Sequence, residues 1–215
     1  MNGVLVLVAG PSGAGKDTLI RRARERLHQD PRFVFVRRVI TRPGDAGGED
    51  HESATPEEFA RQTAAGAFVL SWDAHGLRYG VPSSVETDLA EGRIAVVNVS
   101  RGVIAEATQL YPNSRVVIIT APVEMLAARL AARGREPASE HQARLARPDA
   151  VLTAQSRPIH VSNDGRPEAG AEALIAILRQ CLPQEPKFPP ETQSRTQSTL
   201  SAASGGPSPK VETTT

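Results

Sequence analysis

The segment Gly10-Pro11-Ser12-Gly13-Ala14-Gly15-Lys16-Asp17-Thr18 follows an apolar run, Val4 to Ala9, and precedes a stretch with helical periodicity. A glycine-rich turn between a strand and a helix points backbone NH groups at a polyphosphate, and the helix N-terminus adds its positive dipole end. A lysine at this place reaches the terminal phosphates. We therefore predict that residues 10–18 bind a nucleotide and that Lys16 is a catalytic residue. A turn that only ends a strand is the alternative, and the strand before it and the helix after it disfavour that alternative.

The position after the lysine, where Ser or Thr is usual, is Asp17. A carboxylate repels a neighbouring polyphosphate unless a cation lies between them, so the loop implies Mg²⁺ as well as a nucleotide. The apolar runs 94–99 and 116–120 contain no Asp or Glu to hold that ion. Asp17 is our candidate ligand, directly or through water, and its alternative role is a carboxylate favoured by the helix dipole. Thr18 either offers a hydroxyl to phosphate or metal, or only belongs to the first helical turn.

Composition limits the classes of partner. The chain has 215 residues, a formal net charge of +1 and one cysteine, Cys181. This charge gives no basic field for nucleic acid, and a single cysteine excludes an internal disulfide framework. The apolar runs are too short to span a bilayer and the N-terminus lacks a secretory pattern, so we expect a cytoplasmic protein without a membrane partner. The sequence leaves open whether it is a monomer or a homodimer.

Composition also divides the chain after Leu182, because residues 183–215 are rich in Pro, Ser, Thr, Gln and Gly. We predict a domain over 1–182 and a disordered tail over 183–215. Expected strands at 4–9, 33–39, 67–72, 94–99, 115–120 and 158–162 alternate with expected helices at 17–28, 56–65, 83–91, 102–110, 123–133, 139–155 and 168–181. This alternation predicts an α/β fold with a parallel sheet flanked by helices, interrupted by two stretches, a Gly/Asp/Glu loop at 42–55 and the segment 66–82.

Arginines gather on both sides of Gly134, and they are Arg129, Arg133, Arg135, Arg144 and Arg147. Arg129 and Arg133 lie one helical turn apart, and Gly134 ends that helix. Planar guanidinium groups suit phosphate oxygens, and on a hinged segment they could close over the site during transfer. A solvated helical face is the alternative.

The polar loop from Thr41 to Glu52 supplies candidate residues for binding the molecule that accepts the phosphoryl group. Arg42 could hold a phosphate of the acceptor, and Glu49, Asp50 or His51 could bind sugar hydroxyls or a metal; a merely solvated acidic loop is the alternative. Tyr79 could donate its hydroxyl to an acceptor phosphate or could be a core tyrosine.

Residues 1 to about 181 resemble the guanylate kinase group of nucleoside monophosphate kinases, and most specifically the ribose 1,5-bisphosphate phosphokinases. The loop Gly10 to Lys16 is shared by both, whereas Lys16-Asp17-Thr18, Val39-Ile40-Thr41-Arg42-Pro43 and Gly47-Gly48-Glu49-Asp50-His51-Glu52 look like the second family. The resemblance implies a P-loop nucleoside monophosphate kinase fold with an acceptor-binding insertion and a helical lid. It implies acceptor-phosphate roles for Arg42 and Tyr79, lid roles for Arg129, Arg133 and Arg144, and a place near the donor base for Asn163 and Asp164.

Departures from guanylate kinases concern the acceptor. Leu70 stands where a glutamate is expected to bind guanine, His51 replaces an aromatic residue, and a second acceptor-site arginine is absent. Leucine cannot accept hydrogen bonds from guanine, and leaving the hydrogen-bond donors of that base buried and unpaired costs about 1 to 3 kcal/mol. A phosphate acceptor that has no nucleotide base therefore fits the sequence better.

The resemblance then implies ATP-dependent phosphorylation of ribose 1,5-bisphosphate to 5-phospho-α-D-ribose 1-diphosphate (PRPP), with release of ADP, in phosphonate breakdown by the carbon-phosphorus lyase route. The alternatives are a guanylate kinase, converting GMP to GDP, and a non-catalytic scaffold.

Overall fold

The computed structural model describes residues 2–44, 49–133 and 157–183. These residues all belong to the first of two units into which the chain divides, 1–183 and 184–215. The helix expected at 139–155, with Arg144, lies outside the described residues, and so does the expected tail from residue 184 on.

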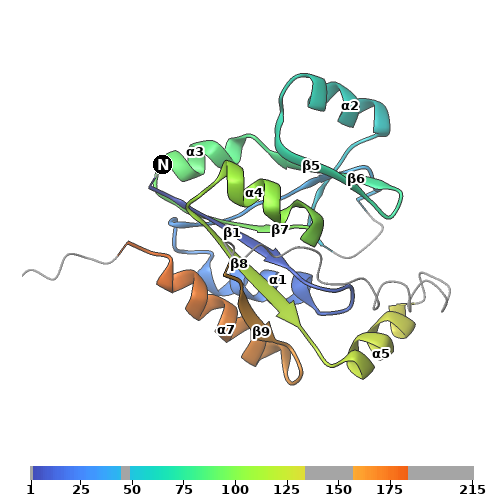
Figure 1. Cartoon of the computed structure of the whole chain (residues 1–215), viewed down its shortest axis with the longest axis vertical. Coiled ribbons are helices and arrows are strands. Elements are labelled where there is room, and N and C mark those ends of the chain that lie inside the picture. Colours follow the sequence, from blue (N-terminus) through green and yellow to red (C-terminus); the bar gives the residue numbers. More distant parts are fainter. Residues whose placement is uncertain (1, 45–48, 134–156, 184–215) are drawn as a thin grey trace, which may run out of the picture. The chain divides into compact units, whose positions relative to one another are not determined.

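A five-stranded parallel sheet forms the centre of the described unit (Figure 1). Its strands are β1 (Val4–Ala9), β2 (Phe33–Phe35), β7 (Ile94–Asn98), β8 (Ser114–Thr120) and β9 (Ile159–Ser162), in the order β2-β7-β1-β8-β9. Every residue of β1 is buried, and this strand is a continuous apolar run because both of its faces are covered. The predicted α/β class is confirmed.

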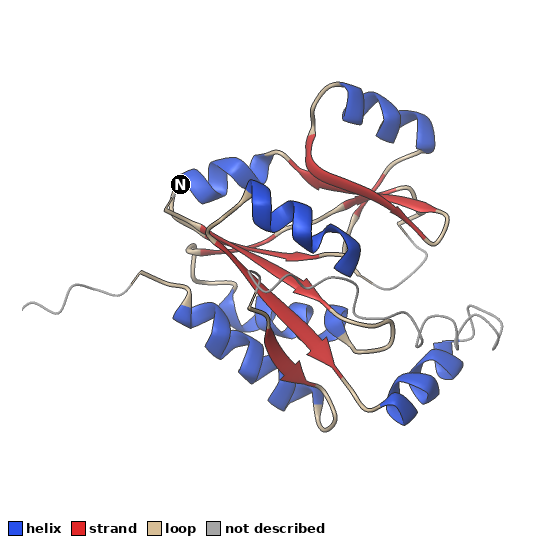
Figure 2. Ribbon diagram, in the orientation of Figure 1, coloured by secondary structure: helices blue, strands red, loops and turns tan. Residues whose placement is uncertain are grey.

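Helices cover the two faces of this sheet (Figure 2). On one face, α1 (Lys16–Leu27) and α7 (Pro167–Gln180) pack on alternate β1 residues, Val4, Val6 and Val8. On the other face, α3 (Ser84–Ala90) and α4 (Ile104–Leu110), which follows the 3₁₀ turn η1 (Arg101–Val103), pack on Leu5, Leu7 and Ala9. A further helix, α5 (Val123–Arg133), follows β8. Among the described helices, none combines the length and apolar character needed to cross a bilayer.

A second sheet has the order β4-β3-β6-β5. It contains β3 (Val39–Ile40), β4 (Glu52–Ser53), β5 (Phe68–Ala74) and β6 (Leu77–Pro82), with antiparallel β3/β6 and β5/β6 pairs. Helix α2 (Pro56–Ala64) begins at a capping box of Thr55 and Glu58 and stacks Phe59 on Phe68 of β5. These elements form an insertion between β2 and α3.

Two expectations about strands are wrong. The segment 33–39 is not one strand, because β2 ends at Phe35 in the first sheet and β3 begins at Val39 in the second. The strand expected at 67–72 is present as β5, but it belongs to the second sheet and not to the parallel one, and the stretch 66–82 that interrupts the alternation contains the antiparallel hairpin of β5 and β6. Its turn residues, His75 and Gly76, have φ values of 55° and 71°, the left-handed pair that a two-residue hairpin turn requires.

Candidate active site

The predicted phosphate-binding loop connects the central strand β1 to α1 at the carboxyl edge of the parallel sheet, where ligands of open α/β folds bind. Gly10 and Gly15 have φ values of 147° and 87°. A Cβ on Gly10 would lie 2.1 Å from the carbonyl oxygen of Ile119, and one on Gly15 would lie 2.4 Å from Nδ2 of Asn163. Only glycine fits these two positions, because any side chain there would collide with β8 or with Asn163.

Lys16 is the first residue of α1, and its side chain turns back over the loop. Its Nζ donates hydrogen bonds to the carbonyl oxygens of Gly10, at 2.9 Å, and Pro11, at 3.1 Å. Burial lowers the pKa of Lys16 to about 8, partly opposed by Asp17, which raises it. The ammonium group therefore lies inside the loop, where a polyphosphate would replace the two carbonyl contacts.

The side chains of Asn163 and Arg129 hold the phosphate-binding loop in place by hydrogen bonds to backbone carbonyl oxygens. Asn163, which follows β9 and is 3% exposed, donates from Nδ2 to the carbonyl of Ala14 at 2.7 Å. Arg129 of α5 donates to the carbonyl oxygens of Asn163, at 3.1 Å, and Gly13, at 3.4 Å. The sequence resemblance implies that these two residues lie at the donor base and in a lid, and the structure places both against the loop backbone. Arg133 is the last residue of α5.

A chain of polar contacts runs from the loop into the insertion. Asn98, at the carboxyl end of β7, donates from Nδ2 to Asp17 at 2.8 Å and to Glu49 at 3.1 Å. Glu49 also accepts from Arg38, through Nε at 3.0 Å and through Nη2. One amide group therefore holds two carboxylates that would otherwise repel each other.

Arg38 is 6% exposed and is fixed by aromatic rings as well as by Glu49. The rings of Trp72 and Tyr79 stack at 5.4 Å, and the guanidinium carbon of Arg38 lies 5.0 Å from the centre of the Tyr79 ring and 5.5 Å from that of Trp72. Such cation–π contacts stabilise a buried guanidinium. Tyr79 therefore supports Arg38 through its ring.

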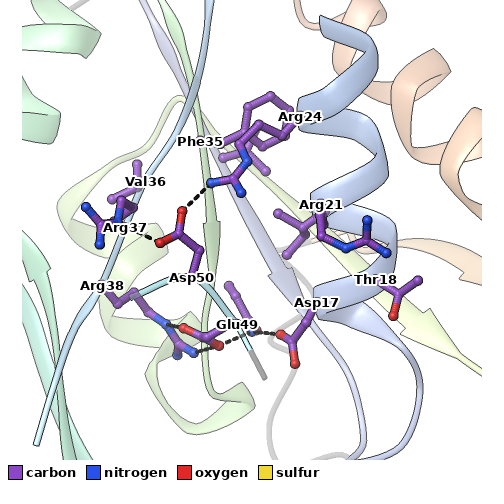
Figure 3. A pocket seen from close by; sticks show the side chains of 13 residues that line it. Asp17, Thr18, Arg21, Arg24, Phe35, Val36, Arg37, Arg38, Glu49 and Asp50 are labelled. Carbon is purple, nitrogen blue, oxygen red and sulfur yellow. Dashed lines mark hydrogen bonds and ion pairs between the residues drawn. The ribbon is translucent and has the colours of Figure 1, made fainter. Parts of the chain in front are cut away.

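A cavity of about 270 Å³ opens between α1 and the segment that follows β2 (Figure 3). Its polar lining comes from α1, from the 37–38 and 49–50 segments and from β7: Asp17, Thr18, Arg21, Arg24, Arg37, Arg38, Glu49, Asp50 and Asn98. Asp50 lies between two arginines, 2.5 Å from Nη1 of Arg24 and 2.9 Å from Nε of Arg37. Hydrogen bonding from Arg24 is the main cause that lowers the pKa of Asp50 below its usual value.

The sequence-predicted acceptor residues separate into two groups. Glu49 and Asp50 line the cavity, whereas the cavity lining described here does not include Arg42, His51 or Tyr79. His51 is buried, with Nδ1 3.0 Å from the carbonyl oxygen of Glu49 and Nε2 3.2 Å from that of Arg42. It therefore closes the turn that presents Glu49 and Asp50.

Sequence reasoning missed five polar residues of this cavity, namely Arg21, Arg24, Arg37, Arg38 and Asn98. The two arginines on α1 lie opposite the apolar positions of the expected helix, which drew no attention to them, and those at 37 and 38 fell inside an expected strand. The pair Arg37-Arg38, directly after an apolar strand, was a signal in the sequence that could have indicated a site. Side chains at the carboxyl ends of parallel strands meet at one edge of the sheet, where ligands bind.

Leu70, at the position expected for guanine binding, is a core residue. It is 2% exposed and packs with Val81, Val85 and other residues beneath α3 and α4. The Leu70 side chain therefore contributes to the stability of the hydrophobic core.

Comparison with known proteins gives the family. A family model described as an AAA domain matches residues 6–147. The chain is 53% identical to ribose 1,5-bisphosphate phosphokinase PhnN of Acidiphilium cryptum, over 84% of this chain and 94% of that protein. It is 49% identical to the protein of the same name from Methylobacterium radiotolerans, over 84% of this chain and all of that protein.

A solved guanylate kinase, from Anaplasma phagocytophilum, superposes with a TM-score of 0.63 at 19% identity, over 83% of this chain and 85% of that one. At this identity the likeness concerns the fold alone, and it agrees with the P-loop kinase architecture described above. The chain belongs to the AAA domain family and to the family of ribose 1,5-bisphosphate phosphokinases.

Proposed function

We propose that this protein transfers the γ-phosphoryl group of ATP to the 1-phosphate of ribose 1,5-bisphosphate, producing PRPP and ADP. The two relatives that are 53% and 49% identical to this chain are named for this activity, and the match covers 94% of one and all of the other. The structural observation that carries the proposal is the cavity beside Lys16, whose lining combines four arginines with three carboxylates. Such a lining suits a small acceptor with several negative charges and sugar hydroxyls.

The residue at position 70 disfavours GMP as the phosphoryl acceptor. A guanine base needs a hydrogen-bond acceptor for its buried donors, and Leu70 offers none and lies in the core. The guanylate kinase alternative rests on a fold likeness at 19% identity. The scaffold alternative is disfavoured by Lys16 and by the two glycines that shape the loop.

Each candidate residue has a role in the proposed phosphoryl transfer. An oxygen of the 1-phosphate attacks the γ-phosphorus of ATP, the bond from that phosphorus to the β,γ-bridging oxygen breaks, and ADP leaves. The attacking oxygen is already anionic at neutral pH, so no general base is required. Lys16 follows the charge as it moves between the two phosphates, and Arg129 lies close enough to the loop to turn toward them. Arg133 and Arg144 are proposed to complete this arginine set, and Arg42 to assist acceptor binding.

The donor atoms beside Lys16 fit Mg²⁺, which prefers oxygen ligands and octahedral geometry. Asp17 and Thr18 line the cavity and would hold the ion. When bound, Mg²⁺ neutralises charge on the transferring phosphates. The described residues contain no group of three or more His, Cys, Asp or Glu side chains able to hold a metal alone. Magnesium sites in kinases typically use one or two carboxylates together with substrate phosphates, so this donor set suffices.

The cellular setting follows from the substrates. ATP and sugar phosphates are cytoplasmic metabolites, so we propose a cytoplasmic enzyme, and the resemblance to ribose 1,5-bisphosphate phosphokinases supports a role in the breakdown of phosphonates. The partner required for the reaction is a small sugar phosphate.

The test is a comparison of acceptors. Purified protein receives ATP, Mg²⁺ and either ribose 1,5-bisphosphate or GMP, and ADP release is followed. The proposal predicts turnover with ribose 1,5-bisphosphate and a much lower kcat/KM with GMP. Faster turnover of GMP would favour the guanylate kinase alternative, and no turnover of either would favour the scaffold.

Lys16→Met is the matched control, because it keeps a linear side chain of similar length and removes the charge. Loss of one preorganised cationic contact costs about 10²–10³ in kcat. An ADP signal that persists unchanged in this variant comes from a contaminating enzyme.

A further inference from the structure

The cavity has two ends of different composition. At one end, Asp17, Glu49 and Arg38 are near enough to Lys16 to influence it electrostatically. At the other end, Arg24 and Arg37 hold Asp50 between them (Figure 3). The first end therefore adjoins Lys16, and the second lies farther along α1.

Helix geometry gives the separation of the two ends. Asp17 and Arg24 are seven residues apart on α1 and both line the cavity. Seven residues rise roughly 10 Å along a helix axis. Arg24 therefore lies about two helical turns beyond Asp17, away from the end of the cavity that adjoins Lys16.

The remote end is built to bind an anion. Two guanidinium groups, one from α1 and one from the segment after β2, converge there on a single carboxylate, because Asp50 forms ion pairs with Nη1 of Arg24 and with Nε of Arg37. Nη2 of Arg37 also donates to the carbonyl oxygen of His51 at 3.0 Å. Each guanidinium carries five N–H donors in a planar fork, so both can donate to further oxygens. A phosphate with nearly two charges at neutral pH competes well against one carboxylate for such a pair.

These observations rest on the proposed function and extend it to the substrate's second phosphate. We infer that Arg24 and Arg37 bind the 5-phosphate of ribose 1,5-bisphosphate and thereby select a bisphosphorylated pentose, while Asp50 holds the two arginines in place before the substrate arrives. In a nucleoside monophosphate the same end of the acceptor is an uncharged base, which leaves this arginine pair without its anion.

The experiment separates the two phosphates by using two half-substrates as probes. Ribose 5-phosphate carries only the remote phosphate and ribose 1-phosphate only the reacting one. The Kd of each probe is measured by isothermal titration calorimetry for the wild type, Arg24→Met and Arg37→Met. KM and kcat for ribose 1,5-bisphosphate are measured in parallel.

We expect each variant to weaken ribose 5-phosphate binding about 10- to 100-fold, the usual effect of losing one charge-assisted contact. Binding of ribose 1-phosphate should stay within about twofold, and KM for the bisphosphate should rise while kcat changes little. Equal weakening of both probes would overturn the inference, because it would mean a general electrostatic effect. An unchanged Kd for ribose 5-phosphate would overturn it as well.

Arg26→Met is the matched control. Arg26 lies on the same helix, is exposed and pairs with Glu172 of α7 at 2.9 Å, away from the cavity lining. The substitution removes the same charge from α1 and should alter neither Kd. Failure of the proposed function has a different signature, since the wild type would then not turn over ribose 1,5-bisphosphate, whatever the probes show.

Discussion

Replacement of Gly15 by alanine perturbs the contact that fixes the phosphate loop. Gly15 has a φ of 87°, and its Cβ would lie 2.4 Å from Nδ2 of Asn163, which donates to the carbonyl of Ala14. The left-handed backbone costs an alanine about 1 to 2 kcal/mol. Displacing the Asn163 amide leaves a buried carbonyl unpaired, at about 1 to 3 kcal/mol. Gly15→Ala should therefore lower the free energy of unfolding by about 2 to 5 kcal/mol.

Urea unfolding measures this loss, and ATP affinity measures the accompanying distortion of the loop. Gly92→Ala is the matched control, because Gly92 has a φ of 79° and no atom within 4 Å of its Cβ position. It should show only the backbone cost, about 1 to 2 kcal/mol, with ATP affinity unchanged.

A double-mutant cycle then isolates the contact. In an Asn163→Ala background the methyl group introduced by Gly15→Ala has room, so this substitution should cost only its backbone strain, leaving a coupling energy of about 1 to 3 kcal/mol. Additivity of the two substitutions within about 0.5 kcal/mol would refute the reasoning, since it would mean that Gly15 and Asn163 do not interact.

Three further predictions concern Lys16, Asp17 and Leu70. Because the pKa of Lys16 is lowered to about 8 in the free protein and its ammonium form binds phosphate, kcat/KM for ATP should fall as the pH rises through about 8; a fall only near pH 10 would contradict this. In Asp17→Ala the Mg²⁺ concentration for half-maximal activity should rise about tenfold, the equivalent of about 1.4 kcal/mol, and Asp17→Ser should recover part of it, whereas an unchanged titration in both would exclude Asp17 as a ligand. Leu70→Glu should lower the free energy of unfolding by more than the 2 to 5 kcal/mol or so expected of Leu70→Ala, measured in urea, without creating activity on GMP; a gain of GMP turnover would show that position 70 faces the acceptor.

Much of the parallel sheet was predictable because its signals are local. The strands β1, β7 and β8 are apolar runs bounded by turns, and α1, α2, α5 and α7 agree with the expected helices to within one residue. Their periodicity reflects burial against a single sheet, so a short window of sequence contains it.

The second sheet was not predictable in the same way. Strands β3 and β4 have two residues each, too few for an alternating pattern, and their pairing depends on residues distant in the chain. The hairpin turn His75-Gly76 lacks the usual Asn-Gly or Asp-Gly signal, although it adopts the same left-handed conformation.

The site shows the same division. Lys16, Asp17, Glu49 and Asp50 stand in motifs and were identified from the sequence, whereas Asn98 acquires its role only when β7 is placed between β1 and β2. A lone asparagine at a strand end carries no chemical signal until its neighbours are known.

Phosphorus NMR of the reaction product tests the central claim most directly. With ATP, Mg²⁺ and ribose 1,5-bisphosphate, the account predicts that the 1-phosphate resonance is replaced by a pair of coupled diphosphate resonances, that the 5-phosphate resonance remains, and that one ADP forms per diphosphate. An unchanged 1-phosphate resonance, or the appearance of ADP without a new diphosphate on the sugar, would contradict it.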